Sequence, residues 1–281
     1  MKVNHDFHIH TNLSLCAPDA TGTVENYIES AKKHGLVKLG FANHFWGSEP
    51  GNREYFKNTK MADDRLNPIY FYDVQNFEHV MQLLPELKAV DEDNIKVYFG
   101  AECEYDPFKK SIAVTWEQVE AFDFIIVPNS HTHVTMPQSF YEPYEKHIEF
   151  MFDAFYDIVN CEFSKYITAI AHPFCAVACP YDRNILNRMI SDDDYKRAFD
   201  AAANKDIAFE INVWQVSAEN LQSLDILAED IRMAKLAKEC GCKLIFGSDA
   251  HIISEHQYYN NADKIAEVLG LTQDDIAEIA R

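Results

Sequence analysis

A heptapeptide near the N-terminus, Asn4-His5-Asp6-Phe7-His8-Ile9-His10, sets a pattern that recurs along the whole chain. Residues two apart in a β-strand project to the same side, so a strand here presents His8 and His10 on one face. Two imidazoles at the end of a strand can bind one metal ion, and Asp6 could orient a histidine from behind. A His-x-His pair alone also occurs as ordinary polar residues, so this interpretation depends on the rest of the chain.

Length and composition favour an acidic enzyme with one large core. The 281 residues fit a single domain, 1–281, because no repeat or low-complexity linker interrupts them. The net charge of −20 argues against non-specific nucleic-acid binding and against an anionic membrane as partner. The seven cysteines show no zinc-knuckle spacing, and neither a signal peptide nor a membrane span is seen. We therefore expect a cytoplasmic protein with reduced thiols; its oligomeric state cannot be read from sequence.

Short apolar segments alternate with amphipathic ones throughout the chain. The apolar segments are rich in β-branched and aromatic residues, as in parallel strands buried on both faces; they are 3–9, 36–42, 95–101, 122–127, 167–171, 207–211 and 243–247. The segments predicted as helices are 24–34, 72–90, 144–161, 186–204, 227–240, 260–269 and 272–280. Seven β–α units in series predict an α/β protein whose strands close into a barrel, with an open doubly wound sheet as the alternative.

Each predicted strand is followed by a side chain that can bind metal. These residues are His8 and His10, His44, Glu102 and Glu104, His131 and His133, His172, Glu210 and Asn212, and Asp249 with His251. In a β/α barrel the C-terminal ends of the strands form the face that carries the active site. Scattered surface histidines would also fall on helices or at strand starts, as His34, His79, His147 and His256 do; we give these four no role.

The number of candidate ligands exceeds what one ion needs. Six histidines, two or three carboxylates and possibly Asp19 suit two or three ions, because a zinc ion takes about four ligands. Imidazole with carboxylate fits zinc, manganese or iron, and the sequence does not choose among them. Cys16 and Cys103 lie near these positions, and we interpret them as packing residues.

An ordered set of motifs resembles the PHP (polymerase and histidinol phosphatase) family, most of all its stand-alone histidinol-phosphatase-like members. The matching segments are 8–11, 14–19, 40–44, 100–102, 130–131, 171–173 and 247–251. The resemblance implies a distorted seven-stranded β/α barrel with a trinuclear metal centre at the strand ends that hydrolyses phosphoesters.

The resemblance also implies a role for each matching residue. His8, His10, Glu102 and Asp249 would bind one metal, Asp19, His44 and His251 a second, and Glu102 with His131 and His172 the third. For Asp19 the alternative is a turn before the first helix. Two positions depart from the family: Asn43 stands where Asp is common, and the arginine expected after Glu210-Ile211-Asn212 is missing.

The expected chemistry is attack on phosphorus by a metal-activated hydroxide, with Asp249 and His251 beside the nucleophile. Because the expected arginine is missing, we predict that Arg183 binds the phosphate of a small phosphomonoester, with Arg53 as second candidate. Arg53 belongs to the long loop 45–71, which we interpret as a lid or pocket wall, with a plain surface excursion as the alternative.

Three other functions stay open at this stage. A phosphodiesterase or nuclease acting on nucleotides or oligonucleotide ends needs the same metal chemistry. A metal-dependent amidohydrolase also uses a His-x-His on a barrel, but that family commonly has a carboxylated lysine where this chain has Glu102. A degenerate, non-enzymatic barrel would be expected to have lost ligands.

Overall fold

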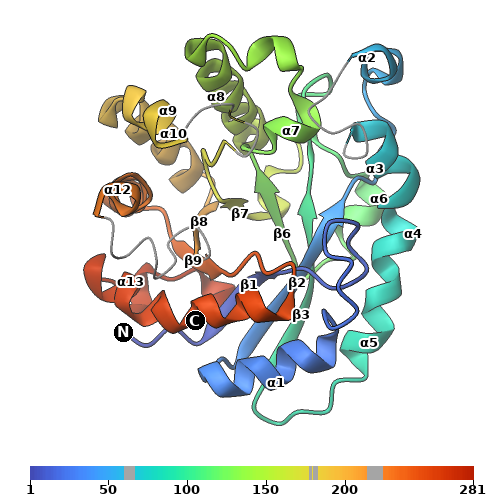
Figure 1. Cartoon of the computed structure of the whole chain (residues 1–281), viewed down its shortest axis with the longest axis vertical. Helices are drawn as coiled ribbons and strands as arrows, with labels where there is room; N and C mark the ends of the chain where they lie inside the picture. The colour runs from blue at the N-terminus through green and yellow to red at the C-terminus, as the bar shows by residue number, and fades with distance from the viewer. Residues whose placement is uncertain (60–66, 177–178, 180–182, 214–223) are drawn as a thin grey trace.

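Seven parallel strands form the centre of the computed structural model, which describes residues 1–59, 67–176, 179, 183–213 and 224–281. The strands are β1 (His5–Ile9), β2 (Lys38–Phe45), β3 (Lys96–Cys103), β6 (Phe124–Pro128), β7 (Ile167–Ala171), β8 (Ala208–Asn212) and β9 (Leu244–Gly247). They lie in the order β1-β2-β3-β6-β7-β8-β9, so neighbours in sequence are neighbours in the sheet (Figure 1). Every predicted strand is confirmed, with ends shifted by at most a few residues.

The first and last strands meet, so the sheet is a nearly closed barrel. The His10 amide donates to the Ala250 carbonyl at 3.1 Å, and the Asp249 amide donates to the His8 carbonyl at 2.7 Å. Nearer the start of β1, the backbone N–H of Phe246 in β9 donates to His5 Nε2 at 3.1 Å. These contacts confirm the predicted barrel and make the open doubly wound sheet wrong.

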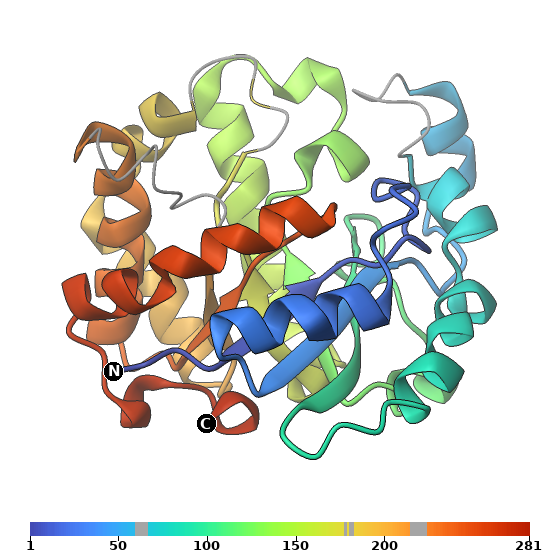
Figure 2. The same cartoon turned by 60° about the horizontal axis from the view of Figure 1, so that its bottom comes forward.

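Helices surround this barrel in the order that the sequence predicts. The longer ones are α1 (Val24–His34), α8 (Tyr144–Asn160), α10 (Asp192–Ala203) and α12 (Leu224–Glu239). Shorter ones are α2 (Arg53–Asn58), α3 (Pro68–Val74), α4 (Phe77–Val80), α5 (Leu84–Lys88), α6 (Trp116–Val119), α7 (Thr132–Thr135), α9 (Arg183–Met189) and α13 (Ala262–Val268). Figure 2 shows α1 lying beside the 3₁₀ segment Ile253–Asn261 and α13, which together cover the barrel next to β1. Within the described part of the chain, no helix has both the length and the apolar character of a membrane span.

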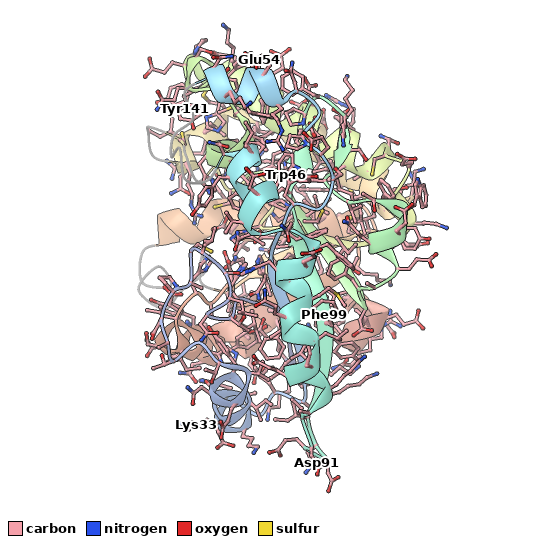
Figure 3. All side chains as sticks on the ribbon, turned by 90° about the vertical axis from the view of Figure 1, so that its right-hand side faces the viewer. Lys33, Trp46, Glu54, Asp91, Phe99 and Tyr141 are labelled. Carbon is pink, nitrogen blue, oxygen red and sulfur yellow. The ribbon has the colours of Figure 1, made fainter. Side chains whose placement is uncertain are left out.

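Local caps explain why some predicted helices are shorter than expected. Helix α1 has the predicted bounds, with Thr23 at its N-cap and Gly35 in the left-handed conformation at its C-cap (φ 69°). The predicted helix 72–90 is instead broken into α3, α4, a 3₁₀ turn and α5, because Asn76 starts a new helix by accepting from the His79 amide. Figure 3 shows α4 and α5 in succession along the sheet near Phe99.

Two further predicted helices differ from the structure, one because of a cap and one because of strand pairing. The predicted helix 186–204 divides into α9 and α10 because the Ser191 hydroxyl caps α10 through the Asp194 amide. The predicted helix 272–280 is wrong, since only the short 3₁₀ turns Gln273–Asp275 and Glu278–Ala280 form there. Between them Ile276 pairs with Leu244 of β9, which requires extended backbone.

Aromatic packing fills the barrel below the polar end. The Phe7 ring packs against Tyr98 and Phe124, with both pairs of ring centroids 5.1 Å apart. A Cβ added to Gly40 or Gly100 would come within 2.6 or 2.2 Å of the Phe124 ring. The two glycines therefore leave the space that this ring occupies. The opposite end of the barrel, where the strands terminate, is left to polar side chains.

Candidate metal centre

The strand ends gather most of the predicted ligands into one buried cluster. Among the residues that the structure describes, four groups of three or more side chains have ligand atoms within 4.8 Å of one another. They are His8/His10/Asp249, His8/Glu102/His172, His44/Glu104/His131 and His10/Cys16/His44/His251. Eight of the nine predicted ligands are among them, and the exception is Asp19.

Glu102 lies at the centre of the cluster and is fully buried. Its Oε1 is 2.9 Å from His172 Nε2 and 3.3 Å from His131 Nε2. Its Oε2 is 2.9 Å from His44 Nδ1 and 3.4 Å from the Nε2 atoms of both His8 and His10. One carboxylate thus faces five imidazoles with both oxygens, the geometry that a bridging ligand requires.

Glu104 points into the same cluster, because residues two apart in β3 share a face. Its Oε1 is 3.2 Å from His44 Nδ1, and its Oε2 is 3.0 Å from His131 Nδ1. The sequence marked both glutamates as metal-capable, but only Glu102 entered the predicted ligand set. Glu104 is therefore a candidate ligand that the resemblance did not supply.

Asp249 approaches the cluster from the β9 side. Its Oδ1 lies 3.2 Å from His10 Nε2 and 3.4 Å from His8 Nε2, while Oδ2 accepts from Asn212 Nδ2 at 3.1 Å. The backbone of Asp249 has φ 53°, a strained value for a non-glycine residue. His251 Nδ1 lies 2.8 Å from the Asp249 carbonyl oxygen and must donate to it, which leaves its Nε2 lone pair free for a metal.

Glu210 fixes two candidate ligands at once. Its Oε1 lies 2.6 Å from His8 Nδ1, and its Oε2 accepts from the backbone N–H of His172 at 2.5 Å. His172 has a positive φ of 27°, so this bond supports a strained backbone. The Ser130 hydroxyl lies 2.8 Å from His172 Nδ1, which directs the Nε2 of His172 at Glu102. Glu210 and Ser130 therefore orient candidate ligands and are not candidate ligands themselves.

Two polar residues of the first strands support the backbone beside the cluster. The Asn43 side chain accepts from the Thr11 backbone N–H at 2.8 Å and donates to the Thr11 hydroxyl at 2.9 Å. Asp6 accepts from the backbone N–H groups of His8 at 3.0 Å and Ser248 at 2.9 Å, and lies 3.1 Å from His256 Nε2. The histidine ring beside Asp6 is therefore that of His256, to which the sequence gave no role.

The two loop residues near the second predicted metal are arranged differently from the prediction. Asp19 Oδ1 accepts from the Thr21 amide at 2.9 Å, a bond that lowers the pKa of this carboxyl. It belongs to none of the four groups found among the described residues. Cys16 instead lies with His44 and His251: burial alone would raise the pKa of its thiol, but these two histidines lower it to about 6. Cys103 is buried away from these groups, and burial raises the pKa of its thiol well above the ordinary value.

Charges in the cluster depend strongly on one another. Burial alone would raise the pKa of Glu102, but the imidazoles of His44, His131 and His8 hold it well below its usual range. Burial would lower the pKa of His8, but the carboxylates of Glu210, Asp249 and Glu102 raise it well above its ordinary value. For His10, burial and the neighbouring His251 and His44 lower the pKa, which keeps a lone pair available. Such coupled groups are typical of functional sites.

The donor set fits metal ions. Glu102 Oε2 is buried, and no contact to it has hydrogen-bond geometry within the described structure, although His44 Nδ1 lies 2.9 Å away. The Nε2 atoms of His8 and His10 lie only 3.1 Å apart. So many buried nitrogens and carboxylate oxygens at one point are costly unless a cation binds among them. Imidazole and carboxylate are ligands of zinc, manganese and iron, so the residues present suit such ions.

The predicted phosphate-binding arginines both have acidic partners. Arg183 begins α9, where its guanidinium lies 2.8 Å from Cys175 Sγ and 3.3 Å from Asp230 Oδ2. Arg53 in α2 donates to Glu49 at 2.7 Å.

The loop 45–71 is described only in part, since 60–66 fall outside the described residues, so its predicted role as a lid stays a prediction. Figure 3 places Glu54 of α2 at the same end of the molecule as Tyr141, beyond Trp46, which follows β2.

Comparison with known proteins identifies the family. A PHP domain profile matches residues 6–213. The chain belongs to the PHP family. None of the curated proteins compared with it matches.

Two solved structures share the fold of this PHP protein. Histidinol phosphate phosphatase of Lactococcus lactis, crystallised with zinc, L-histidinol and phosphate, is 21% identical, with a TM-score of 0.62 and 98% of each chain covered. The putative histidinol phosphatase of Listeria monocytogenes is 14% identical, with a TM-score of 0.60, 90% of this chain covered and 97% of that chain. Membership of the PHP family, together with the buried His and Glu groups, supports a metal-dependent phosphoesterase.

Proposed function

We propose that this PHP protein hydrolyses a small phosphomonoester, histidinol phosphate or a similar metabolite, at a centre of two to three metal ions. The observation that carries the proposal is Glu102, a fully buried carboxylate facing five imidazoles at the mouth of the barrel. No fold of this kind needs so many buried titratable groups for stability, because each costs desolvation energy. The same place in a β/α barrel is where catalytic side chains gather.

The proposed ligands divide into overlapping sets around Glu102. His8, His10, Glu102 and Asp249 would hold one ion; Glu102, His131 and His172 a second, with Glu104 within reach of His131; and His44 with His251 a third. When bound, such ions lower the pKa of a shared water and neutralise phosphate oxygens. Histidine and carboxylate donors bind zinc, manganese and iron alike, so the metal that is bound depends on ligand type and on which metal is available.

The chain's own residues prepare the site for an in-line displacement. Asp249 is positioned by Asn212, and its Oδ1 faces the same space as His8 and His10. His251 is half-buried, and burial alone would lower its pKa, but nearby Cys16 and Asp249 raise it to about 9. With Nδ1 donating to the Asp249 carbonyl, His251 would present Nε2 to a metal and so hold an ion beside the attacking water. No covalent nucleophile is required, and Ser130 is already engaged with His172.

Recognition of the phosphate is assigned to Arg183. Its pairing with Asp230 does not prevent this role, because a guanidinium presents five N–H donors and one carboxylate uses only part of them. The Asp230 carboxylate can hold the fork in one orientation while other donors face a phosphate. Cys175, the second partner, lies three residues beyond His172 and so ties Arg183 to the rim of the centre.

The test is hydrolysis by metal-reconstituted protein across matched phosphomonoesters, phosphodiesters and amides. We expect inorganic phosphate from the monoesters, histidinol phosphate included, and little turnover of the others. Glu102→Gln purified in parallel is the control for contaminating phosphatases, and it should lose at least 99% of the rate, about 2.7 kcal/mol of barrier. Turnover of diesters or oligonucleotide ends alone would favour the nuclease alternative, and turnover of amides alone the amidohydrolase. Equal rates for wild type and Glu102→Gln would refute the proposal.

A further inference from the structure

Cys16 stands in a place that the sequence assigned to Asp19. Its Sγ and one ring nitrogen from each of His10, His44 and His251 lie within 4.8 Å of one another. His10 is already assigned to the ion held with His8, Glu102 and Asp249, so the His44 and His251 imidazoles and the Cys16 thiol remain as three donors of the types that zinc takes. With Zn–N near 2.0–2.1 Å and Zn–S near 2.3 Å, neighbouring ligand atoms of such a site are separated by about 3.3–3.7 Å. The observed group needs only small side-chain movements to reach this spacing.

The loop that carries Cys16 is held in position by several bonds. The Thr11 amide donates to Asn43 Oδ1 at 2.8 Å, and the Leu15 amide donates to Gln75 Oε1 at 2.8 Å. The Leu13 carbonyl lies 2.7 Å from His79 Nε2, and the Ala17 amide closes a turn on the Ser14 carbonyl at 3.0 Å. Asn43 is the residue next to His44, so one of these tethers ties the loop directly to a strand that bears a ligand. Cys16 is therefore placed over the histidines by the fold and not by chance exposure.

Asp19 is engaged in a different task. Its Oδ1 accepts from the Thr21 amide at 2.9 Å, and its carbonyl accepts from the Gly22 amide at 2.9 Å. A Cβ added to Gly22 would come within 3.2 Å of the same carbonyl oxygen, so this turn is compact. The turn leads the chain into Thr23, which caps α1. Asp19 thus shapes the entry of α1.

We propose that Cys16 supplies a thiolate ligand to the ion held by His44 and His251, in place of the carboxylate of Asp19. This inference deepens the proposed function, because it concerns one ion of the same centre. A thiolate is a softer donor than a carboxylate and favours zinc over manganese or magnesium. The position nearest Cys16 should therefore retain zinc when the other positions exchange to manganese.

Cobalt substitution gives a direct test that does not depend on catalysis. The protein is stripped with chelator and reloaded with Co²⁺, and its near-ultraviolet absorption is recorded. A thiolate-to-cobalt charge-transfer band is expected in wild type and in Asp19→Asn, and it should be absent in Cys16→Ser. Cys240→Ser is the matched thiol control, because the Cys240 thiol belongs to none of the four ligand groups and donates a hydrogen bond to the Lys196 carbonyl. This variant should keep the band.

Zinc binding gives the second readout. Loss of a partner that merely orients a ligand costs about 10–100-fold in affinity, so Cys16→Ser should weaken the most affected zinc site by at least that factor. Cys16→Asp restores a negative ligand of similar reach and should recover binding without the charge-transfer band. If Cys16→Ser does not fold, wild type alone decides: one fewer thiol should react with a disulfide reagent in the zinc-loaded protein than in the stripped protein.

Opposite results overturn the proposal. A band that persists in Cys16→Ser, or an equal number of reactive thiols with and without zinc, shows that Cys16 is not a ligand. Loss of one metal equivalent in Asp19→Asn but not in Cys16→Ser returns the role to Asp19. None of these readouts requires turnover, so a protein that binds metal through Cys16 but hydrolyses no phosphoester would refute the proposed function and leave this inference standing.

Discussion

Replacing Glu210 with glutamine tests whether residues behind the ligands govern metal affinity. The carboxylate holds His8 Nδ1 at 2.6 Å through one oxygen and the His172 backbone N–H at 2.5 Å through the other. Glutamine keeps one acceptor oxygen and replaces the other with an NH₂ group. Whichever way its amide turns, one of the two N–H donors then faces another donor, so one of the two supports is lost.

The size of the effect follows from what these bonds do. Losing a partner that orients a ligand costs about 10–100-fold in metal affinity, which is about 1.4–2.7 kcal/mol. The structure places the expected value toward the upper end, because Glu210 serves two ligands and one of them has a strained backbone. Retention of the carbonyl oxygen keeps the loss below that of removing a ligand itself.

The assay is competition for zinc against a chelator of known affinity, with circular dichroism to confirm the fold. Glu229→Gln is the matched control, because Glu229 is a buried glutamate that pairs with Arg232 outside the four ligand groups. We expect unchanged zinc affinity in the control and a loss of about 10–100-fold in Glu210→Gln. Equal affinity in both variants would refute the argument that Glu210 orients His8 and His172.

Three further predictions concern separate parts of the structure. Glu102→Gln should reduce kcat/KM and metal content more than Glu104→Gln, because Glu102 faces five imidazoles and Glu104 two; equal losses would show that the bridge is shared. Arg183→Ala should lower kcat/KM by a factor equivalent to about 2–4 kcal/mol while the metal content stays constant. Unchanged kinetics would show that Arg183 does not bind the phosphate. Burial and nearby Lys38 lower the pKa of His5 to about 3, so the folded state takes up fewer protons than the unfolded chain below pH 6.5 and stability falls as the pH drops. His5→Gln, which keeps an acceptor for Phe246 N–H, should spare about 2 kcal/mol of the wild type's loss between pH 7 and 5 in urea unfolding, whereas identical losses would contradict this cause.

The strands and most of the ligands could be predicted because both follow from short-range rules. Buried parallel strands are short and apolar, and a parallel barrel brings all of their C-terminal ends to one face. His8, His44 and His172 could therefore be placed together without any knowledge of the loops. The division of 72–90 into several short helices was missed, since an Asn cap inside an amphipathic segment is a weak signal beside the hydrophobic pattern.

Other features depend on contacts between distant residues and could not be read from the chain. Cys16 reaches the cluster only because Asn43, Gln75 and His79 hold its loop, and no local pattern announces those tethers. The two hydrogen bonds that Glu210 accepts, from His8 and from His172, join three strand ends and depend on the closure of the barrel. Glu104 was marked as metal-capable, because a strand that directs Glu102 inward directs the residue two positions later inward as well; only its contacts with His44 and His131 were not foreseen.

The number of metal ions per chain tests the central claim most directly. The claim is that the buried histidines and carboxylates around Glu102 form a centre of several ions, since their donors exceed the four that one zinc takes. The protein is purified gently, reconstituted with zinc or manganese, freed of loosely bound metal and analysed by inductively coupled plasma mass spectrometry beside Glu102→Gln. The account predicts two to three equivalents per chain and a loss of at least one in Glu102→Gln; less than one equivalent in wild type would contradict it.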